Sequence, residues 1–337
     1  MMNKRAVIFG VKGTTLTEEE KDFFKQVNPL GFIFFKRNIE SKEGIKNLIS
    51  DIKNLLKRED ILFLIDQEGG RVQRIREPLT INYKSACEIG KVYEKDNQKG
   101  LKFAYLTGLT IGSELAELGF NVNCAPVLDI FYEKTSEVIG DRAFSNTPNT
   151  VAILAKEYAK GMIDAGITPI VKHIPGHGRS LKDTHKDISV VDAKITDMIE
   201  TDFIPFKNFD LPCFAMMSHI IYSEIDNKNP ATLSKKIRKF IKEELGFSGL
   251  IMSDDFSMQA LTNFESSFEV LAEKSLKTGV DIVLHCNGNM EEMVKIAPNI
   301  KNLCNNRKKI IKNTLALSVS VDYSKCKLEY EEFLKCI

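Results

Sequence analysis

Three short segments of this chain carry residue types from which an active site could be built. Residues 66–74, DQEGGRVQR, place carboxylates and guanidiniums on both sides of a glycine pair. Such groups accept and donate hydrogen bonds to the hydroxyls and carbonyls of a polar ligand. Adjacent glycines also let the backbone come close to that ligand. The same composition is typical of a salt-bridged turn, so the residues alone leave both interpretations open.

The second segment is histidine-rich. KHIPGHG at residues 172–178, followed by DTH at 183–185, holds three of the five histidines. A zinc site would need convergent ligands that this spacing does not establish, and the G-x-x-x-x-G-K-[ST] phosphate motif is absent. In a third interpretation Asp183, two residues before His185, orients the imidazole and favours its cation, which makes an acid/base pair near neutral pH.

The third segment, SDDFSM at residues 253–258, ends an apolar run with two adjacent aspartates. Side chains of a strand alternate in direction, so at most one of Asp254 and Asp255 is expected to point into a site as an attacking carboxylate. The other would cap the helix expected from Phe256 onward. In the alternative interpretation both aspartates are helix caps.

Short apolar runs rich in β-branched and aromatic residues recur along the chain and predict about eight strands. They are Ala6–Phe9, Gly31–Phe35, Ile61–Ile65, Asn121–Ala125, Thr168–Lys172, Cys213–Ser218, Gly249–Ser253 and Asp281–Cys286. Amphipathic stretches between them predict helices, among them Ser41–Lys57, Gln98–Leu118, Thr150–Ala165, Ser234–Leu245 and Phe268–Thr278.

This alternation predicts an α/β fold, a (β/α)₈ TIM barrel with a parallel sheet inside and helices outside. An open doubly wound sheet is the alternative, but no G-x-G-x-x-G follows the first strand. Ionisable residues follow several predicted strands, namely Asp66, Asp129, Lys172, His173, His219 and Asp254. Because the carboxyl ends of barrel strands converge on one mouth, where active sites of this fold lie, the pattern indicates an enzyme.

Length and composition indicate further what class of protein this is. The 337 residues contain no repeat or Pro/Gly-rich linker, so we expect residues 1–337 to form a single domain. A net charge of +1 gives no general attraction to nucleic acid or anionic membrane. No apolar run reaches the ~20 residues of a transmembrane helix, and no signal peptide is evident. The seven scattered cysteines form no C-x-x-C pair, so we expect a soluble protein of the reducing cytoplasm.

Taken together, the three segments resemble glycoside hydrolase family 3, specifically the single-domain β-N-acetylglucosaminidases that act in peptidoglycan recycling. NVNCAPVLDI at 121–130, VIGDRAF at 138–144 and MMSHI at 216–220 extend the resemblance, in the order of the family. The chain departs from the family at Thr184, where serine is usual, and at Ile174, where an aromatic residue is common. Neither position supplies a reacting group.

The resemblance implies a role for each motif residue. Asp254 would be the nucleophile, His185 the acid/base and Asp183 its support. The terminal sugar and its N-acetyl group would be bound by Asp66, Arg74, Arg142, Lys172 and His173. The chain would then release terminal β-linked N-acetylglucosamine from peptidoglycan fragments by double displacement with retention.

The resemblance further implies a reaction without a metal or organic cofactor and a small carbohydrate substrate as the partner, and we expect a monomer. Three alternatives stay open at this point. Phosphorolysis is possible because a neutral histidine would repel an attacking phosphate less than a glutamate would. A sugar-binding barrel without catalysis would have no use for an acid/base loop. A metal-dependent barrel hydrolase would explain the histidines but not the first strand, which lacks a pair of ligands.

Overall fold

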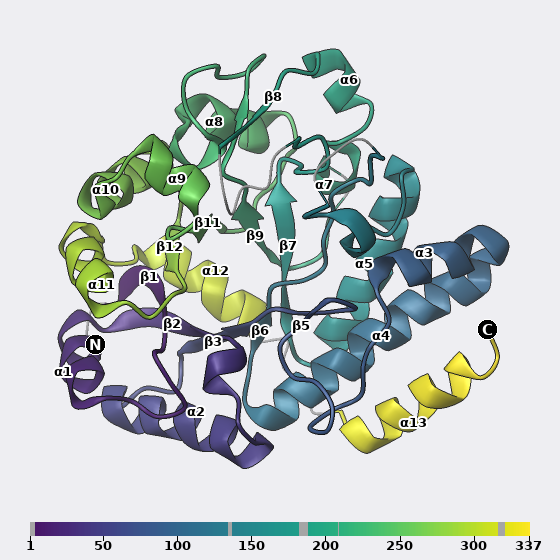
Figure 1. The fold of residues 1–337 in the computed structure, drawn as a ribbon, viewed down its shortest axis with the longest axis horizontal. Coiled ribbons are helices and arrows are strands. Elements are labelled where there is room, and N and C mark those ends of the chain that lie inside the picture. The colour runs from purple at the N-terminus through teal and green to yellow at the C-terminus, as the bar shows by residue number, and fades with distance from the viewer. Residues whose placement is uncertain (1–3, 134–136, 182–187, 208, 316–320) are drawn as a thin grey trace.

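The computed structural model describes residues 4–133, 137–181, 188–207, 209–315 and 321–337. Eight strands close a barrel in which every neighbouring pair is parallel and the strand order follows the sequence (Figure 1). They are β1 (Arg5–Gly10), β2 (Pro29–Phe34), β3 (Leu62–Ile65), β6 (Val122–Asn123), β7 (Thr168–Ile174), β9 (Phe214–Met217), β11 (Ile251–Asp255) and β12 (Ile282–His285).

The strands are buried on both faces, which explains their almost continuous apolar sequences. Helices surround the barrel and cover its outer face (Figure 1). The longer ones are α1 (Glu18–Val27), α2 (Lys42–Leu56), α3 (Ala86–Lys95), α4 (Asn97–Leu118), α5 (Pro148–Asp164), α8 (Lys235–Glu243), α10 (Phe268–Thr278), α12 (Asn305–Leu315) and α13 (Tyr323–Leu334). Shorter helices are α6 (Ile195–Ile199), α7 (Ile204–Lys207), α9 (Gln259–Phe264) and α11 (Met290–Ile296).

Two small two-stranded sheets lie outside the barrel. The antiparallel hairpin of β4 (Gln67–Gly69) and β5 (Val72–Gln73) follows β3 directly. A parallel pair joins β8 (Ser189–Val191) to β10 (Ile220–Tyr222). Both lie on connections that leave the carboxyl ends of barrel strands, so they build the mouth rather than the core.

The predicted architecture is confirmed: all eight predicted strands are present, and the open doubly wound alternative is wrong because the sheet closes. All five helices named from the sequence are present within three residues at each end. The helix expected from Phe256 onward instead begins at Gln259. Within the described parts of the chain, no helix is long and apolar enough to cross a membrane.

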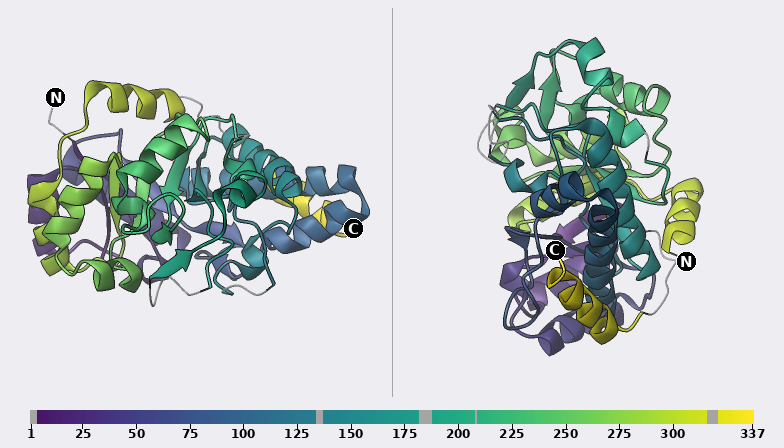
Figure 2. Two further views of the ribbon diagram at one scale, coloured as in Figure 1. Left: turned by 90° about the horizontal axis from the view of Figure 1, so that it is seen from above. Right: turned by 90° about the vertical axis from the view of Figure 1, so that its right-hand side faces the viewer.

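The last helix, α13, packs along α4 on the outside of the barrel, as the two views of Figure 2 also show. Asp322 caps its N-terminus by accepting hydrogen bonds from the backbone N–H groups of Ser324 and Lys325. Cys326 and Tyr330 are its buried residues. This helix therefore adds to the outer ring near the C-terminus.

Candidate active site

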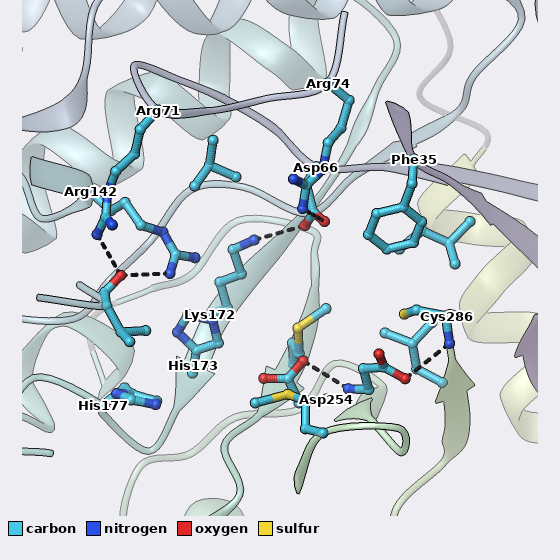
Figure 3. A pocket seen from close by; sticks show the side chains of 17 residues that line it. Phe35, Asp66, Arg71, Arg74, Arg142, Lys172, His173, His177, Asp254 and Cys286 are labelled. Carbon is cyan, nitrogen blue, oxygen red and sulfur yellow. Dashed lines mark hydrogen bonds and ion pairs between the residues drawn. The ribbon is translucent and has the colours of Figure 1, made fainter. Parts of the chain in front are cut away.

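A cavity of about 370 Å³ opens where the barrel strands end. This volume lies within the range of about 300–1,000 Å³ that is usual for small-molecule sites. Its walls come from segments far apart in the sequence, because each strand of the closed barrel delivers its last residues to the same mouth. The charged residues that line it are Asp66, Arg71, Arg74, Arg142, Lys172, Asp254 and Asp255, beside His173 and His177 (Figure 3).

Asp66 lies between two cations. Its carboxylate accepts a hydrogen bond from Lys172 Nζ at 3.0 Å and from Arg74 Nη2 at 2.8 Å. Asp66 directly follows β3, Lys172 lies near the end of β7, and Arg74 follows the β4–β5 hairpin. The guanidinium of Arg74 also lies over the ring of Phe35, 5.1 Å from its centroid.

Glu68 extends this arrangement into a chain of five charges. Lys172 Nζ lies 2.6 Å from Glu68 Oε1, so the ammonium bridges both carboxylates. Arg142 binds the same glutamate through two hydrogen bonds, from Nε at 2.9 Å and from Nη2 at 2.8 Å. Positive and negative charges therefore alternate along the order Arg74, Asp66, Lys172, Glu68, Arg142. We call these five residues, Arg74, Asp66, Lys172, Glu68 and Arg142, the charge network.

The charge network controls the ionisation of its buried members. Burial by itself would raise the pKa of Glu68, but Arg142 and Lys172 together outweigh burial and lower that pKa to about 2. Asp66 behaves in the same way: burial opposes ionisation, yet Lys172 and Arg74 hold its pKa well below the usual range. Burial would lower the pKa of Lys172, and the two carboxylates raise it instead. All three groups are charged at neutral pH.

A third arginine, Arg71, links the segment around Val138 to the hairpin. Arg71 Nη2 donates to the Val138 carbonyl at 2.7 Å, and Arg142 Nη1 donates to the same oxygen at 3.0 Å (Figure 3). Arg71 Nε also pairs with Asp141 at 2.6 Å. The VIGDRAF segment is thus fixed against DQEGGRVQR, and this contact brings Arg142 to the cavity.

The two adjacent aspartates of β11 differ in their surroundings. Asp255 accepts hydrogen bonds from the backbone N–H groups of Ser257 and Cys286 and from the Ser257 hydroxyl, at 2.6–3.0 Å. It thereby fixes the turn after β11 and the end of β12. Asp254 Oδ1 accepts from the Asp255 N–H at 2.8 Å, and its carboxylate lies in the same cavity as four members of the charge network, Asp66, Arg74, Arg142 and Lys172 (Figure 3).

His219 supports the end of β11 from behind. Its Nε2 lies 3.0 Å from the Asp255 carbonyl, which can only accept, so Nε2 carries the proton. Nδ1 then accepts from the Thr232 hydroxyl at 2.7 Å. Burial lowers the pKa of this histidine, in agreement with a neutral ring that fixes the backbone of the aspartate pair.

Asp129 organises the histidines that follow β7. Its carboxylate lies 2.6 Å from His173 Nδ1 and accepts from the backbone N–H groups of His173 and His177. The peptide bond between Lys172 and His173 is cis. Burial and the neighbouring His173 lower the pKa of His177 to about 4, so His177 is neutral at pH 7. Because Nδ1 of His173 contacts Asp129, Nε2 is the nitrogen of this ring that remains available to a ligand.

Six residues predicted from the sequence line this one cavity: Asp66, Arg74, Arg142, Lys172, His173 and Asp254. Asp183 and His185 lie outside the described residues. The two interpretations of the DQEGG segment prove compatible, because its salt bridges are themselves part of the cavity wall. In the described ranges no group of three or more His, Cys, Asp or Glu side chains could hold a metal ion.

The sequence interpretation missed Glu68 as a functional residue, and it placed Asp129 after a strand without giving it a role. A signal for Glu68 was present: residues 66 and 68 are two apart in extended backbone, so their side chains point to the same face. For Asp129 the signal was weaker, since only its place after a strand distinguishes it. The arrangement around each one depends on partners 40 or more positions away in the chain.

We expect Glu68→Gln to destabilise the protein by about 3 kcal/mol, because Lys172 and Arg142 lose a buried partner. The pKa of Glu68 lies below its ordinary value of 4.5, so its stabilising effect is complete above that pH and disappears as the pH falls towards 2. The difference from wild type in urea unfolding should therefore shrink on acidification. The exposed Glu94→Gln is the control, and equal stability of both variants would contradict this account of the charge network.

A closed parallel barrel with a charged cavity at its carboxyl end is typical of a TIM-barrel enzyme that acts on a small polar substrate. Comparison with protein families agrees. Residues 5–316 match the glycosyl hydrolase family 3 N-terminal domain. The chain belongs to this family and is a glycoside hydrolase.

Individual relatives are similar over most of the chain. A beta-hexosaminidase of Nitrosomonas eutropha is 37% identical over 284 residues, which cover 83% of this chain and 80% of the relative. A beta-hexosaminidase of Thioalkalivibrio sulfidiphilus is 36% identical over 289 residues, which cover 85% of this chain and 82% of the relative. Among solved structures, NagZ from Neisseria gonorrhoeae in complex with N-trifluoroacetyl-D-glucosamine superposes with a TM-score of 0.86 at 26% identity, covering 98% of each chain.

Proposed function

We propose that this glycoside hydrolase releases terminal, non-reducing, β-linked N-acetylglucosamine. The observation that carries the proposal is that Asp254 lines one cavity together with Asp66, Arg74, Arg142 and Lys172 of the charge network, at the mouth of a family 3 barrel. Carboxylates and cations that are already paired offer acceptors and donors in fixed positions to sugar hydroxyls and an amide carbonyl. The names of the similar proteins support the same activity.

In the proposed mechanism Asp254 attacks the anomeric carbon and forms a glycosyl ester while the leaving oxygen takes a proton from His185. Water then attacks the ester, and His185 accepts a proton from it. Asp254 suits the first step because it is a carboxylate at a strand end, with its backbone fixed by Asp255 and His219. The roles of His185 and Asp183 rest on the motif DTH alone.

We further propose that the natural substrate is a peptidoglycan fragment with terminal N-acetylglucosamine, handled by a single-domain monomer in the cytoplasm. The motifs support the peptidoglycan fragment, the structural likeness to NagZ in complex with N-trifluoroacetyl-D-glucosamine supports the terminal sugar, and the scattered cysteines without a C-x-x-C pair support a reducing cytoplasm. Sugar binding would involve Asp66, Arg74, Arg142, Lys172 and His173, with Nε2 of His173 facing the ligand.

The activity is tested by turnover of p-nitrophenyl β-N-acetylglucosaminide beside the corresponding glucoside. A site whose polar groups bind the acetamido group leaves them unpaired with the glucoside, so we expect kcat/KM to favour the first by on the order of 10²-fold or more. Equal values would contradict N-acetyl specificity. Repeating both assays with added phosphate separates hydrolysis from phosphorolysis, because only phosphorolysis releases a sugar phosphate.

A further inference from the structure

The helix α13 lies beyond residues 5–316, the part that matches the family domain, yet it contacts the segment 80–85, which packs against the β4–β5 hairpin. Tyr330 of α13 is fully buried. Its hydroxyl accepts a hydrogen bond from the backbone N–H of Lys84 at 3.1 Å. Its ring packs edge-on against Tyr83, with centroids 5.7 Å apart. Tyr330 therefore contacts both the backbone and a side chain of the segment 80–85.

Other contacts fix the same segment from outside. The hydroxyl of Tyr323, at the start of α13, lies 3.1 Å from Thr80 Oγ1. The Tyr83 hydroxyl donates to Glu114 Oε2 of α4, also at 3.1 Å. The Glu114 side chain is completely buried. Segment 80–85 is thus bound on its outer side by α4 and by both tyrosines of α13.

On its inner side, segment 80–85 packs against the β4–β5 hairpin. The N–H of Gly70 donates to the Tyr83 carbonyl at 2.9 Å, and the N–H of Tyr83 donates to Gln73 Oε1 at 3.1 Å. The approach is close: a Cβ on Gly69 would lie 2.4 Å from the Lys84 carbonyl oxygen. Gly69 also has a φ of 94°, which favours glycine. A shift of segment 80–85 must therefore move the hairpin.

The hairpin in turn holds the charge network. Glu68 immediately precedes the glycine pair and binds Lys172 at 2.6 Å and Arg142 at 2.8 Å. We propose that α13 is a brace for the sugar-binding site, with Tyr330 as a positioning residue that acts through segment 80–85 on the hairpin. The effect of the brace on sugar affinity rests on the proposed function, in which the charge network binds the sugar. Without the brace, Glu68 and its partners would lose their fixed spacing.

Two alanine variants separate this role from general stabilisation. Tyr330→Ala removes the contact with segment 80–85. The control Phe333→Ala removes a ring of the same helix that packs against Phe103 of α4, 5.6 Å away, a ring that Tyr330 also contacts at 6.1 Å. Both should lower the unfolding temperature. We expect only Tyr330→Ala to raise KM for p-nitrophenyl β-N-acetylglucosaminide, by about tenfold, because small misplacements of binding groups have large effects.

The kcat of Tyr330→Ala should stay close to that of wild type, since the affected groups hold the sugar in the ground state and in the transition state alike. Tyr330→Phe keeps the ring and loses the hydroxyl that accepts from Lys84, so it should keep most of the affinity. The proposed brace is contradicted if the KM of Tyr330→Ala equals that of wild type. It is also contradicted if the KM of Phe333→Ala rises as much as that of Tyr330→Ala.

Amide hydrogen exchange tests the same coupling without catalysis. We expect faster exchange of the Gly70 amide in Tyr330→Ala than in Phe333→Ala, because this amide is bonded to Tyr83. If Tyr330→Ala does not fold, Tyr330→Leu serves for this measurement, because it fills more of the space but still lacks the ring and the hydroxyl, and the Gly70 amide is still the site expected to change. Unchanged exchange at Gly70 overturns the brace. A wild-type enzyme that turns over no N-acetylglucosaminide would contradict the proposed function instead, and exchange at Gly70 would still decide the brace.

Discussion

Replacing Asp254 by alanine is expected to lower kcat by on the order of 10⁴-fold or more while the protein stays folded, because the attacking atom of the proposed mechanism is lost. The structure explains why the fold should survive. The end of β11 is fixed by its neighbours, since the Asp255 carboxylate binds Ser257 and Cys286 and His219 binds the Asp255 carbonyl. Circular dichroism and the unfolding midpoint check the fold, and turnover of p-nitrophenyl β-N-acetylglucosaminide checks the activity.

Asp255→Asn is the matched control for this prediction. Asp255 receives three hydrogen bonds from Ser257 and Cys286 and fixes the turn around the cavity, so its replacement should reduce stability and lower activity far less than loss of Asp254. If Asp255→Asn abolished turnover in a folded protein while Asp254→Ala retained it, the assignment of the nucleophile would be reversed.

For His185→Ala we expect an effect that depends on the leaving group. With a natural sugar leaving group the rate should fall on the order of 10²- to 10⁴-fold, the usual range for proton transfer by a positioned side chain. With a dinitrophenolate leaving group the first step needs no proton. Glycosyl-enzyme should then accumulate and give a burst of dinitrophenol, followed by slow hydrolysis without the base. Stopped-flow absorbance measures both phases.

Asp183→Ala serves as the companion variant and should act in the same direction but more mildly, because the imidazole itself remains. If His185→Ala lowered the rate equally for all leaving groups and gave no burst, His185 would be a binding residue. The next candidate would be His177, which lines the cavity. Its pKa of about 4 makes it a poor proton donor at pH 7, so an enzyme that depends on it should be most active in acid.

The barrel itself was predictable from the sequence. Strands such as Thr168–Ile174 and Ile282–His285 are buried on both faces, and burial of this kind requires the apolar runs that mark them. Residues at the carboxyl ends of parallel strands must meet at one mouth. For this reason Asp66, Lys172 and Asp254 could be assigned to one site before any coordinates were known.

The sequence also determined the family, because the motifs themselves carry the reacting groups. It could not determine how those groups are paired. Which of Asp254 and Asp255 is engaged by the backbone depends on the turn after β11, which Asp255 closes through Cys286, the residue that follows the neighbouring strand β12. The helix expected from Phe256 starts later because this turn occupies residues 256–258.

Only the tertiary structure decided which charges neutralise each other. The partners of Glu68 are Arg142 and Lys172, which are 74 and 104 positions away, and no local pattern encodes contacts of that separation. The same holds for Tyr330, whose bond to Lys84 spans 246 positions. Sequence periodicity reports which face of an element is buried. The identity of the residue that meets that face is fixed only when the barrel closes and its outer helices pack.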